Sequence, residues 1–200
     1  MSRSECLCTN PGPTRLAVGA RTLVAVERRD GRYDLHHSQW GGEHLDRLSA
    51  MDRGDGLSPG LVDPDPVCPA VPVQRLLSAL KPRAHEAVVV VGETTETYLV
   101  CWLGIETSRE SESAPSAEAR EGCSSAFTGD VTALVPWTDD ATAARLRRFL
   151  RITKDVLGDA VDAGLVPAWL AASYLAVRLA RHPDSPDDIL WLPRGGANVE

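Results

Sequence analysis

The chain lacks the short motifs by which most nucleotide-binding, zinc-protease and hydrolase sites are identified. Its 200 residues contain no GxGxxG, Walker, HExxH or GxSxG pattern. The N-terminus has no apolar signal-peptide core, and the most apolar helical stretch, 168–181, is too short to span a bilayer. We therefore expect a cytoplasmic protein without a membrane span, and the sequence identifies neither a cofactor nor a metal.

Lysine is scarce in this chain, and the charge balance is acidic. Only Lys81 and Lys154 stand beside nineteen arginines, and the formal net charge is -7. A general nucleic-acid-binding protein would present a basic surface. Nucleic acid is therefore not expected as a general partner, and the preference for arginine is typical of a high-GC genome.

The five cysteines do not form a disulfide framework, because their number is odd and their spacing irregular. Cys6 and Cys8 have no matching second pair nearby, so a structural zinc site is not expected. Cys101 lies in an apolar run, where a thiol packs as a small hydrophobic group. These features favour a reducing, cytoplasmic compartment.

The length suits one domain with flanking segments. We expect a single α+β domain over residues 21–182, preceded by a flexible extension, 1–20, and followed by a tail, 183–200. Residues 106–125 are rich in Ser, Glu and Ala and nearly devoid of large apolar side chains. That composition predicts a disordered insertion.

The most informative segment is 21–44, RTLVAVERRDGRYDLHHSQWGGEH, which predicts a β-hairpin. Asp-Gly is the strongest short hairpin signal, because a type I′ turn needs positive φ at both central residues. With Asp30 and Gly31 as the two turn residues, the strand ladder pairs Val24 with His37.

That register assigns each side chain to a face of the hairpin, because side chains alternate along a strand. The more apolar face is predicted to carry Val24, Val26, Leu35 and His37. The other face is predicted to carry Leu23, Ala25, Glu27, Asp34, His36 and Ser38. The adjacent histidines then point in opposite directions and cannot bind one metal ion together. Burial should lower the pKa of His37, while His36 keeps a more normal titration or, beside a carboxylate, a raised one.

The polar side chains near the end of the second strand form a candidate functional cluster. Its members are His36, Glu27, Asp34, His44 and Trp40. Acid–base chemistry and metal binding both need imidazoles that converge with carboxylates. The alternative interpretation is structural: His36 hydrogen-bonds to polar neighbours, Trp40 covers the sheet edge, and Gly41-Gly42 forms a tight exit turn.

The remaining chain alternates breaker-rich and periodic segments. Glycine and proline are so dense over 46–72 that neither a helix nor a long strand is expected there. A short helix is predicted from periodicity at 73–80. Strands are predicted at 85–92, 97–105 and 129–137, and the short link between the first two favours antiparallel pairing.

The last third predicts two helices, at 139–163 and 168–181, the first with cap candidates Thr138, Asp139 and Asp140 and an end at Gly164. The first helix carries a basic run, Arg145, Arg147, Arg148, Arg151 and Lys154, for which a solvated face is the default interpretation and a phosphate or acidic partner the alternative. The expected fold is therefore α+β, an antiparallel sheet that opens with the hairpin and is covered by the C-terminal helical pair.

The hairpin also resembles the opening of a group of haloarchaeal proteins of unknown function, which share an ER-x-DG-x-Y turn and a D-L-H followed by Ser-x-Trp-Gly. The matching positions are Glu27, Arg28, Asp30, Gly31, Tyr33, Asp34, Leu35, His36, Ser38, Trp40 and Gly41. The run TYLVCWLG at 97–104 is similar to theirs as well. The resemblance implies a salt-adapted archaeal source, which agrees with the scarcity of lysine, and it implies no activity. The first twenty residues and the modest acidity depart from the family.

Two classes of function remain open. The first is a non-enzymatic binding or interaction domain for a protein or small-molecule ligand, favoured because no convergent catalytic set can be assembled. The second is a small metal-dependent or acid–base enzyme that uses His36 with Glu27 or Asp34, and His44.

Overall fold

The computed structural model of the chain describes residues 21–52, 57, 59–106 and 131–192. The predicted extension, 1–20, and residues 107–125 of the predicted insertion lie outside these residues. The chain divides into two compact units, residues 1–100 and 101–200. Each unit is described by itself.

The first unit is built on the hairpin and the strands that flank it. Its strands are β1 (Thr22–Glu27), β2 (Tyr33–Ser38), β3 (Cys68–Val71), β4 (Ala87–Val91) and β5 (Thr95–Trp102), which ends just past the unit boundary. Its helical turns are η1 (Gly41–Glu43), α1 (Leu45–Ser49), α2 (Val73–Leu76) and η2 (Leu77–Ala79). The predicted strands and the short helix at 73–80 are present.

The hairpin register differs by one residue from the predicted one. The ladder pairs Val24 with His36 and Leu23 with His37, because the loop holds three residues instead of two. The N–H of Arg28 donates to the carbonyl of Arg32 at 2.7 Å, and Gly31 has φ of 73°.

The physical reason lies in the backbone of the turn. A type I′ turn needs positive φ at two residues, but only Gly31 adopts it in this loop, so Asp30 keeps an ordinary negative φ. A single left-handed glycine suits the three-residue hairpin loop, and Asp30 Oδ1 accepts the N–H of Arg32 at 3.2 Å. The predicted two-residue turn is therefore wrong.

A parallel pairing, which the sequence did not indicate, joins β1 to β4. It aligns Thr22 with Ala87 at the start of both strands, and β2 pairs antiparallel on the other side of β1. The end of β2 and the start of β4 therefore lie at the same end of the sheet. The antiparallel pairing predicted for β4 and β5 is confirmed.

The breaker-rich segment contains two short elements. Helix α1 buries Leu45 and Leu48 completely before the first glycine of this segment, so the expectation of no helix is wrong for its first residues. Strand β3 has only four residues and an irregular register against β2, with Ala70 at a positive φ of 54°. Helix α1 ends before the first breaker of the segment, and β3 contains Pro69, which is tolerated because β3 is a short strand at the edge of the sheet.

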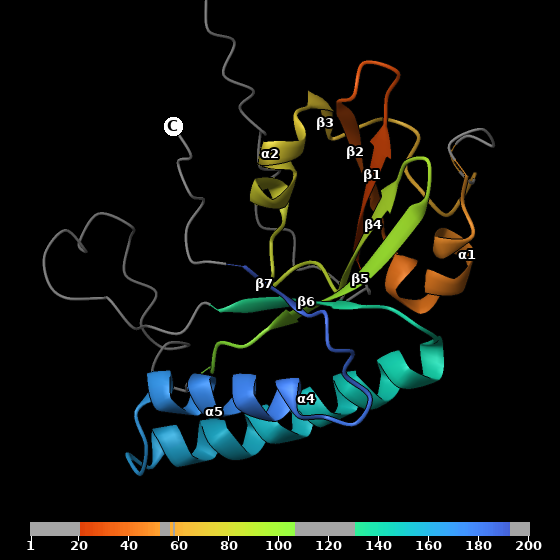
Figure 1. The fold of residues 1–200 in the computed structure, drawn as a ribbon. Helices are drawn as coiled ribbons and strands as arrows, with labels where there is room; N and C mark the ends of the chain where they lie inside the picture. Colours follow the sequence, from red (N-terminus) through yellow and green to blue (C-terminus); the bar gives the residue numbers. More distant parts are fainter. Residues whose placement is uncertain (1–20, 53–56, 58, 107–130, 193–200) are drawn as a thin grey trace, which may run out of the picture. The chain divides into compact units, whose positions relative to one another are not determined.

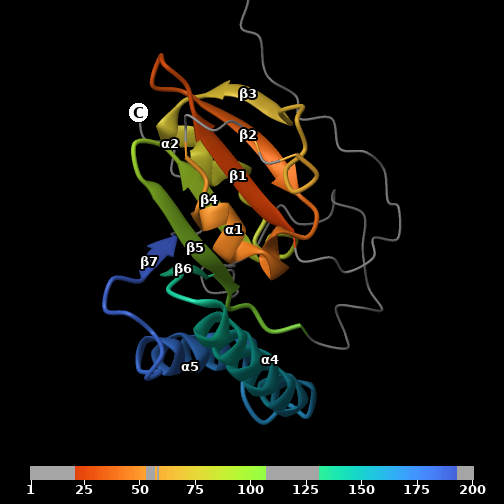
Figure 2. The same ribbon diagram turned by 90° about the vertical axis from the view of Figure 1, so that its right-hand side faces the viewer.

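The second unit contains the helical pair. Its elements are β6 (Thr132–Pro136), α4 (Asp140–Asp162), α5 (Ala168–Ala180) and β7 (Leu190–Leu192). The two helices lie side by side on one side of β6 (Figure 1), as the rotated view in Figure 2 also shows. Strand β7 pairs antiparallel with β6, within the stretch predicted as a tail.

The ends of α4 follow the predicted signals. Asp139 is the N-cap, and its carboxylate accepts the N–H of Thr142 at 2.8 Å. At the other end Gly164 has φ of 71°, and the N–H groups of Gly164 and Leu165 donate to Val161 and Ala160. This pair of bonds is the Schellman arrangement that glycine favours.

The predicted fold class is confirmed. The sheet has seven strands in the order β3-β2-β1-β4-β5-β6-β7, it is mostly antiparallel, and two C-terminal helices follow the hairpin and central strands. None of the helices in the described ranges is both long enough and apolar enough to cross a membrane.

Candidate functional site

His36 is buried on β2, and its side chain is held by the backbone. Its Nδ1 lies 2.8 Å from the carbonyl oxygen of Asp63, with which it can share a hydrogen bond as donor. Asp34 lies two residues earlier in the same strand and therefore on the same face. The structure thus brings these two predicted residues onto one side of the hairpin.

The carboxylate of Asp34 makes hydrogen bonds with two other parts of the first unit. Its Oδ1 accepts the N–H of Ala70 at 2.8 Å, and Arg28 Nη1 donates to both carboxylate oxygens at 3.1 and 3.2 Å. Burial acts to raise the pKa of Asp34, but the bonds from Ala70 and Arg28 outweigh it and lower the pKa below its usual value. The carboxylate therefore stays ionised and holds the irregular part of β3.

No hydrogen bond or ring contact joins His36 to the other three members of the predicted cluster, all of which the structure describes. Glu27 is on the opposite face of the hairpin, beside Gly92, where an added Cβ would meet the Glu27 carboxylate at 3.1 Å. His44 stands half-buried at the start of α1, and Trp40 is 55% exposed at the start of η1. The corrected register alone separates Glu27 from His36.

The glycine pair after Trp40 has a packing role. A Cβ on Gly41 would lie 2.6 Å from Ser38 Oγ and 2.7 Å from the Cβ of Thr22. The same atom would lie 2.8 Å from Leu48 in α1. Glycine therefore lets the exit turn approach the end of the hairpin closely, which agrees with the structural interpretation of this motif.

A second pair of histidines was not anticipated from the sequence. The rings of His37 and His85 have centroids 5.3 Å apart and planes tilted by 56°. His85 is buried, and its Nδ1 accepts the N–H of Lys81 at 3.1 Å, so in the neutral ring the proton resides on Nε2. The two residues are far apart in sequence, and the parallel β1–β4 pairing brings them together.

Both rings of this pair have lowered pKa values. Burial is the main cause at His85 and, with the charges of His37, Lys81 and Arg21, lowers its pKa to about 4. Burial also lowers the pKa of His37, as predicted, with Arg21 acting in the same direction and Asp63 against it. Both imidazoles are therefore neutral at neutral pH.

The described part of the chain does not supply the further ligands that a metal would need. Within it, no group of three His, Cys, Asp or Glu side chains could hold a metal ion. The two neutral imidazoles are in ring contact, and a catalytic role would also need a carboxylate or a nucleophile at hydrogen-bond distance. No such bond to the His37–His85 pair occurs among the described residues.

The structure describes Cys68 and Cys101, and neither forms a disulfide. Cys68 is half-buried in β3, and Cys101 is buried in β5. Burial raises the pKa of the Cys101 thiol to about 12. Because the thiolate is the reactive form, Cys101 is a packing residue and not a nucleophile.

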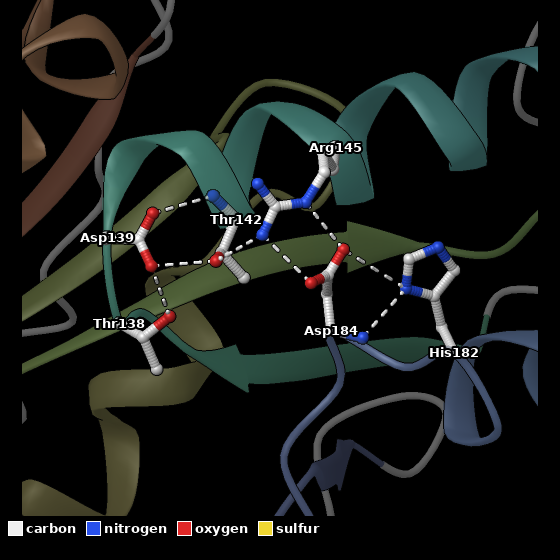
Figure 3. Close-up of polar contacts among 6 residues, drawn as sticks. All are labelled: Thr138, Asp139, Thr142, Arg145, His182 and Asp184. Carbon is white, nitrogen blue, oxygen red and sulfur yellow. Dashed lines mark hydrogen bonds and ion pairs between the residues drawn. The ribbon is translucent and has the colours of Figure 1, made fainter.

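The second unit contains a polar network around the start of α4, shown in Figure 3. Arg145 donates to both oxygens of Asp184 at 2.8 and 2.9 Å and to Thr142 Oγ1 at 2.9 Å. His182 Nδ1 accepts the N–H of Asp184 at 3.2 Å, and its ring lies against Phe149. The hydrogen bond from Arg145 is the largest cause of the lowered pKa of Asp184.

The residues of the predicted basic run have different environments in the structure. Arg145 is engaged with Asp184, and Lys154 lies 4.2 Å from the ring centroid of Trp102, within cation–π range. Arg148 and Arg151 are exposed on α4. The run is thus partly structural and not one continuous anion-binding face.

These features define an α+β protein in which Asp34 binds the backbone of β3 and the side chain of Arg28, the rings of His37 and His85 are in contact, and two C-terminal helices form a hairpin. Residues 48–191 match a family of unknown function, DUF6735, and the chain belongs to this family. No curated protein and no solved structure matches the chain. The family match begins after the hairpin, so the haloarchaeal source and the hairpin motif stay predictions.

Proposed function

We propose that this protein is a non-enzymatic interaction domain that binds a protein partner through the outer side of α5. The observation that carries the proposal is a stripe of exposed apolar side chains on this helix. Its members are Trp169, Leu170, Tyr174 and Val177, and they are between 43% and 50% exposed. We call this set the α5 stripe.

The α5 stripe lies opposite the buried side of its helix. The buried side consists of Ala171, Ala172, Leu175 and Leu179. Leu170, Tyr174 and Val177 follow one another at intervals of four and three residues, which places them on one face. A helix that is apolar on both sides is expected to be covered on both, and exposed apolar patches mark interaction sites on soluble proteins.

Photo-crosslinking tests this proposal in cells that produce the full chain. A photoreactive phenylalanine derivative in place of Tyr174 should give a discrete covalent adduct with a protein. The same group in place of Glu43, which is exposed in the first unit, serves as the control. Absence of any adduct from position 174, or identical adducts from both positions, contradicts the proposal.

The cytoplasmic location and the haloarchaeal source belong to the same proposal. The odd number and irregular spacing of the cysteines support a reducing compartment. The scarcity of lysine and the hairpin resemblance support the source.

A further inference from the structure

We propose that the partner of the α4–α5 helical pair is a second copy of the same chain, bound about a twofold axis with the helices antiparallel. This inference rests on the interaction function proposed above and names its partner. It is carried by the distribution of charge along the two helices, which makes their outer side complementary to itself.

The apolar centre of the proposed interface spans both helices. On α4, Ile152 and Val156 are 51% and 64% exposed, one helical turn apart. Leu165, which follows the glycine after the end of α4, is also exposed and lies in the turn between the two helices. Together with the α5 stripe these residues give the helical pair the large, rigid side chains that dominate the centres of protein interfaces.

One line along α4 changes from basic through apolar to acidic. Residues three or four apart share a side of a helix, and five exposed residues follow that spacing: Arg145, Arg148, Ile152, Asp155 and Asp159. Arg145 is engaged with Asp184, so Arg148 provides the available charge at the basic end.

Helix α5 extends the same polarity. It turns back after Gly164 and packs against α4, so its C-terminal end lies beside the first half of α4. This end carries the exposed Arg178 and Arg181, whereas its N-terminal end carries no charge. On their outer sides the two helices therefore carry more basic than acidic side chains at one end, where the carboxylates Asp139 and Asp140 also lie. They carry apolar side chains in the middle and acidic ones near the inter-helix turn, where Asp159 lies.

A twofold axis through the apolar centre makes the two copies complementary in charge at both ends of the interface. It places the basic end of each copy against the acidic end of the other and the apolar centres against each other. A parallel arrangement would bring like charges together at both ends, which disfavours it. The charge pattern thus selects both the partner and its orientation.

Sedimentation velocity of the purified full chain tests the proposal directly. We expect a species of twice the 21.5 kDa chain mass. The double change Leu170→Asp and Val177→Asp should weaken self-association by roughly tenfold or more, because it puts two charges into the apolar centre. Val73→Asp, an equally exposed valine in α2, is the matched control and should leave the mass unchanged.

A charge-reversal pair tests the orientation. One variant carries Asp155→Arg and Asp159→Arg, and the other carries Arg178→Asp and Arg181→Asp. Each alone should associate more weakly with itself, and an equimolar mixture should recover the dimer, because every reversed contact then faces its opposite charge. The recovery should weaken at high salt.

Two results overturn the inference. A wild-type chain that sediments as a monomer at the highest soluble concentration excludes self-association, whatever the variants do. A wild-type dimer whose charge-reversed mixture fails to recover excludes the antiparallel arrangement. If the chain is a monomer but position 174 crosslinks to a different protein, the interaction function survives and only the second copy is excluded.

Discussion

The close approach of Gly41 to the hairpin makes a single added methyl group a sharp test of the structure. In Gly41→Ala the new Cβ would lie within 3 Å of three atoms, on Ser38, Thr22 and Leu48. Thr22 and Leu48 are completely buried, and the Thr22 atom is a Cβ close to the backbone, which a rotamer change does not move. The variant must therefore shift η1 or α1 away from β1.

The expected loss of stability follows from two opposing effects. Forcing a methyl group into a packed site typically costs about 1–3 kcal/mol. Replacing glycine by alanine also restricts the unfolded chain, which returns about 0.4–1 kcal/mol. The net expectation is a free energy of unfolding about 1–2 kcal/mol lower, or roughly 0.5–1 M in the urea midpoint for a slope near 2 kcal/mol/M.

Urea unfolding followed by circular dichroism measures this shift, and Gly158→Ala is the control. A Cβ on Gly158, inside α4, would meet only the carbonyl oxygen of Glu106 at 3.4 Å, so the higher helix propensity of alanine should raise stability by about 0.5–1 kcal/mol. An unchanged midpoint for Gly41→Ala would refute the packing of the exit turn. In Ser38→Ala/Gly41→Ala the loss should be smaller, because the closest obstacle is gone.

Three further outcomes are expected. Asp34→Ala should lower the free energy of unfolding by about 1–3 kcal/mol, because the N–H of Ala70 loses its acceptor. The pKa of Asp34 is lowered on folding, so its stabilising contribution is present above the ordinary carboxyl pKa and is lost as pH falls through the folded-state pKa. The urea midpoint of Asp34→Asn should therefore change less with pH in the acid range than that of the wild-type chain. Folding lowers the pKa of His85 from 6.5 to about 4, so protonation of its ring should lower the free energy of unfolding by up to about 3 kcal/mol as pH falls from 6.5 to 4. A urea midpoint of His85→Gln that falls with pH as steeply as that of the wild-type chain would contradict this. Cys101 should resist iodoacetamide at pH 8 in the folded protein and react in urea, as peptide mass mapping would show.

Local sequence signals were sufficient wherever the structure depends on neighbouring residues. The cap at Asp139 and the left-handed Gly164 determine the ends of α4, because both act within one helical turn. The apolar runs likewise determined that β4, β5 and β6 are strands. The direction of the pKa shift at His37 was predicted correctly, and burial is its main cause. The face assigned to it was wrong, because Val24 pairs with His36, which is the more buried of the two rings, while His37 pairs with Leu23 and is half-buried.

Which residues of the candidate site lie together depends on the strand register, which the sequence did not determine. Asp-Gly indicated a turn, but whether one or two residues adopt positive φ decides the register, and that difference moved Glu27 away from His36.

The histidine pair shows the same dependence at longer range. His37 and His85 meet because β4 lies parallel to β1. Which strands become neighbours depends on how the whole sheet packs, and the sequence of a single strand does not reveal it. The sequence by itself thus determined the elements and most of their ends. Only tertiary packing decided which side chains share a site, because that depends on contacts between segments distant along the chain.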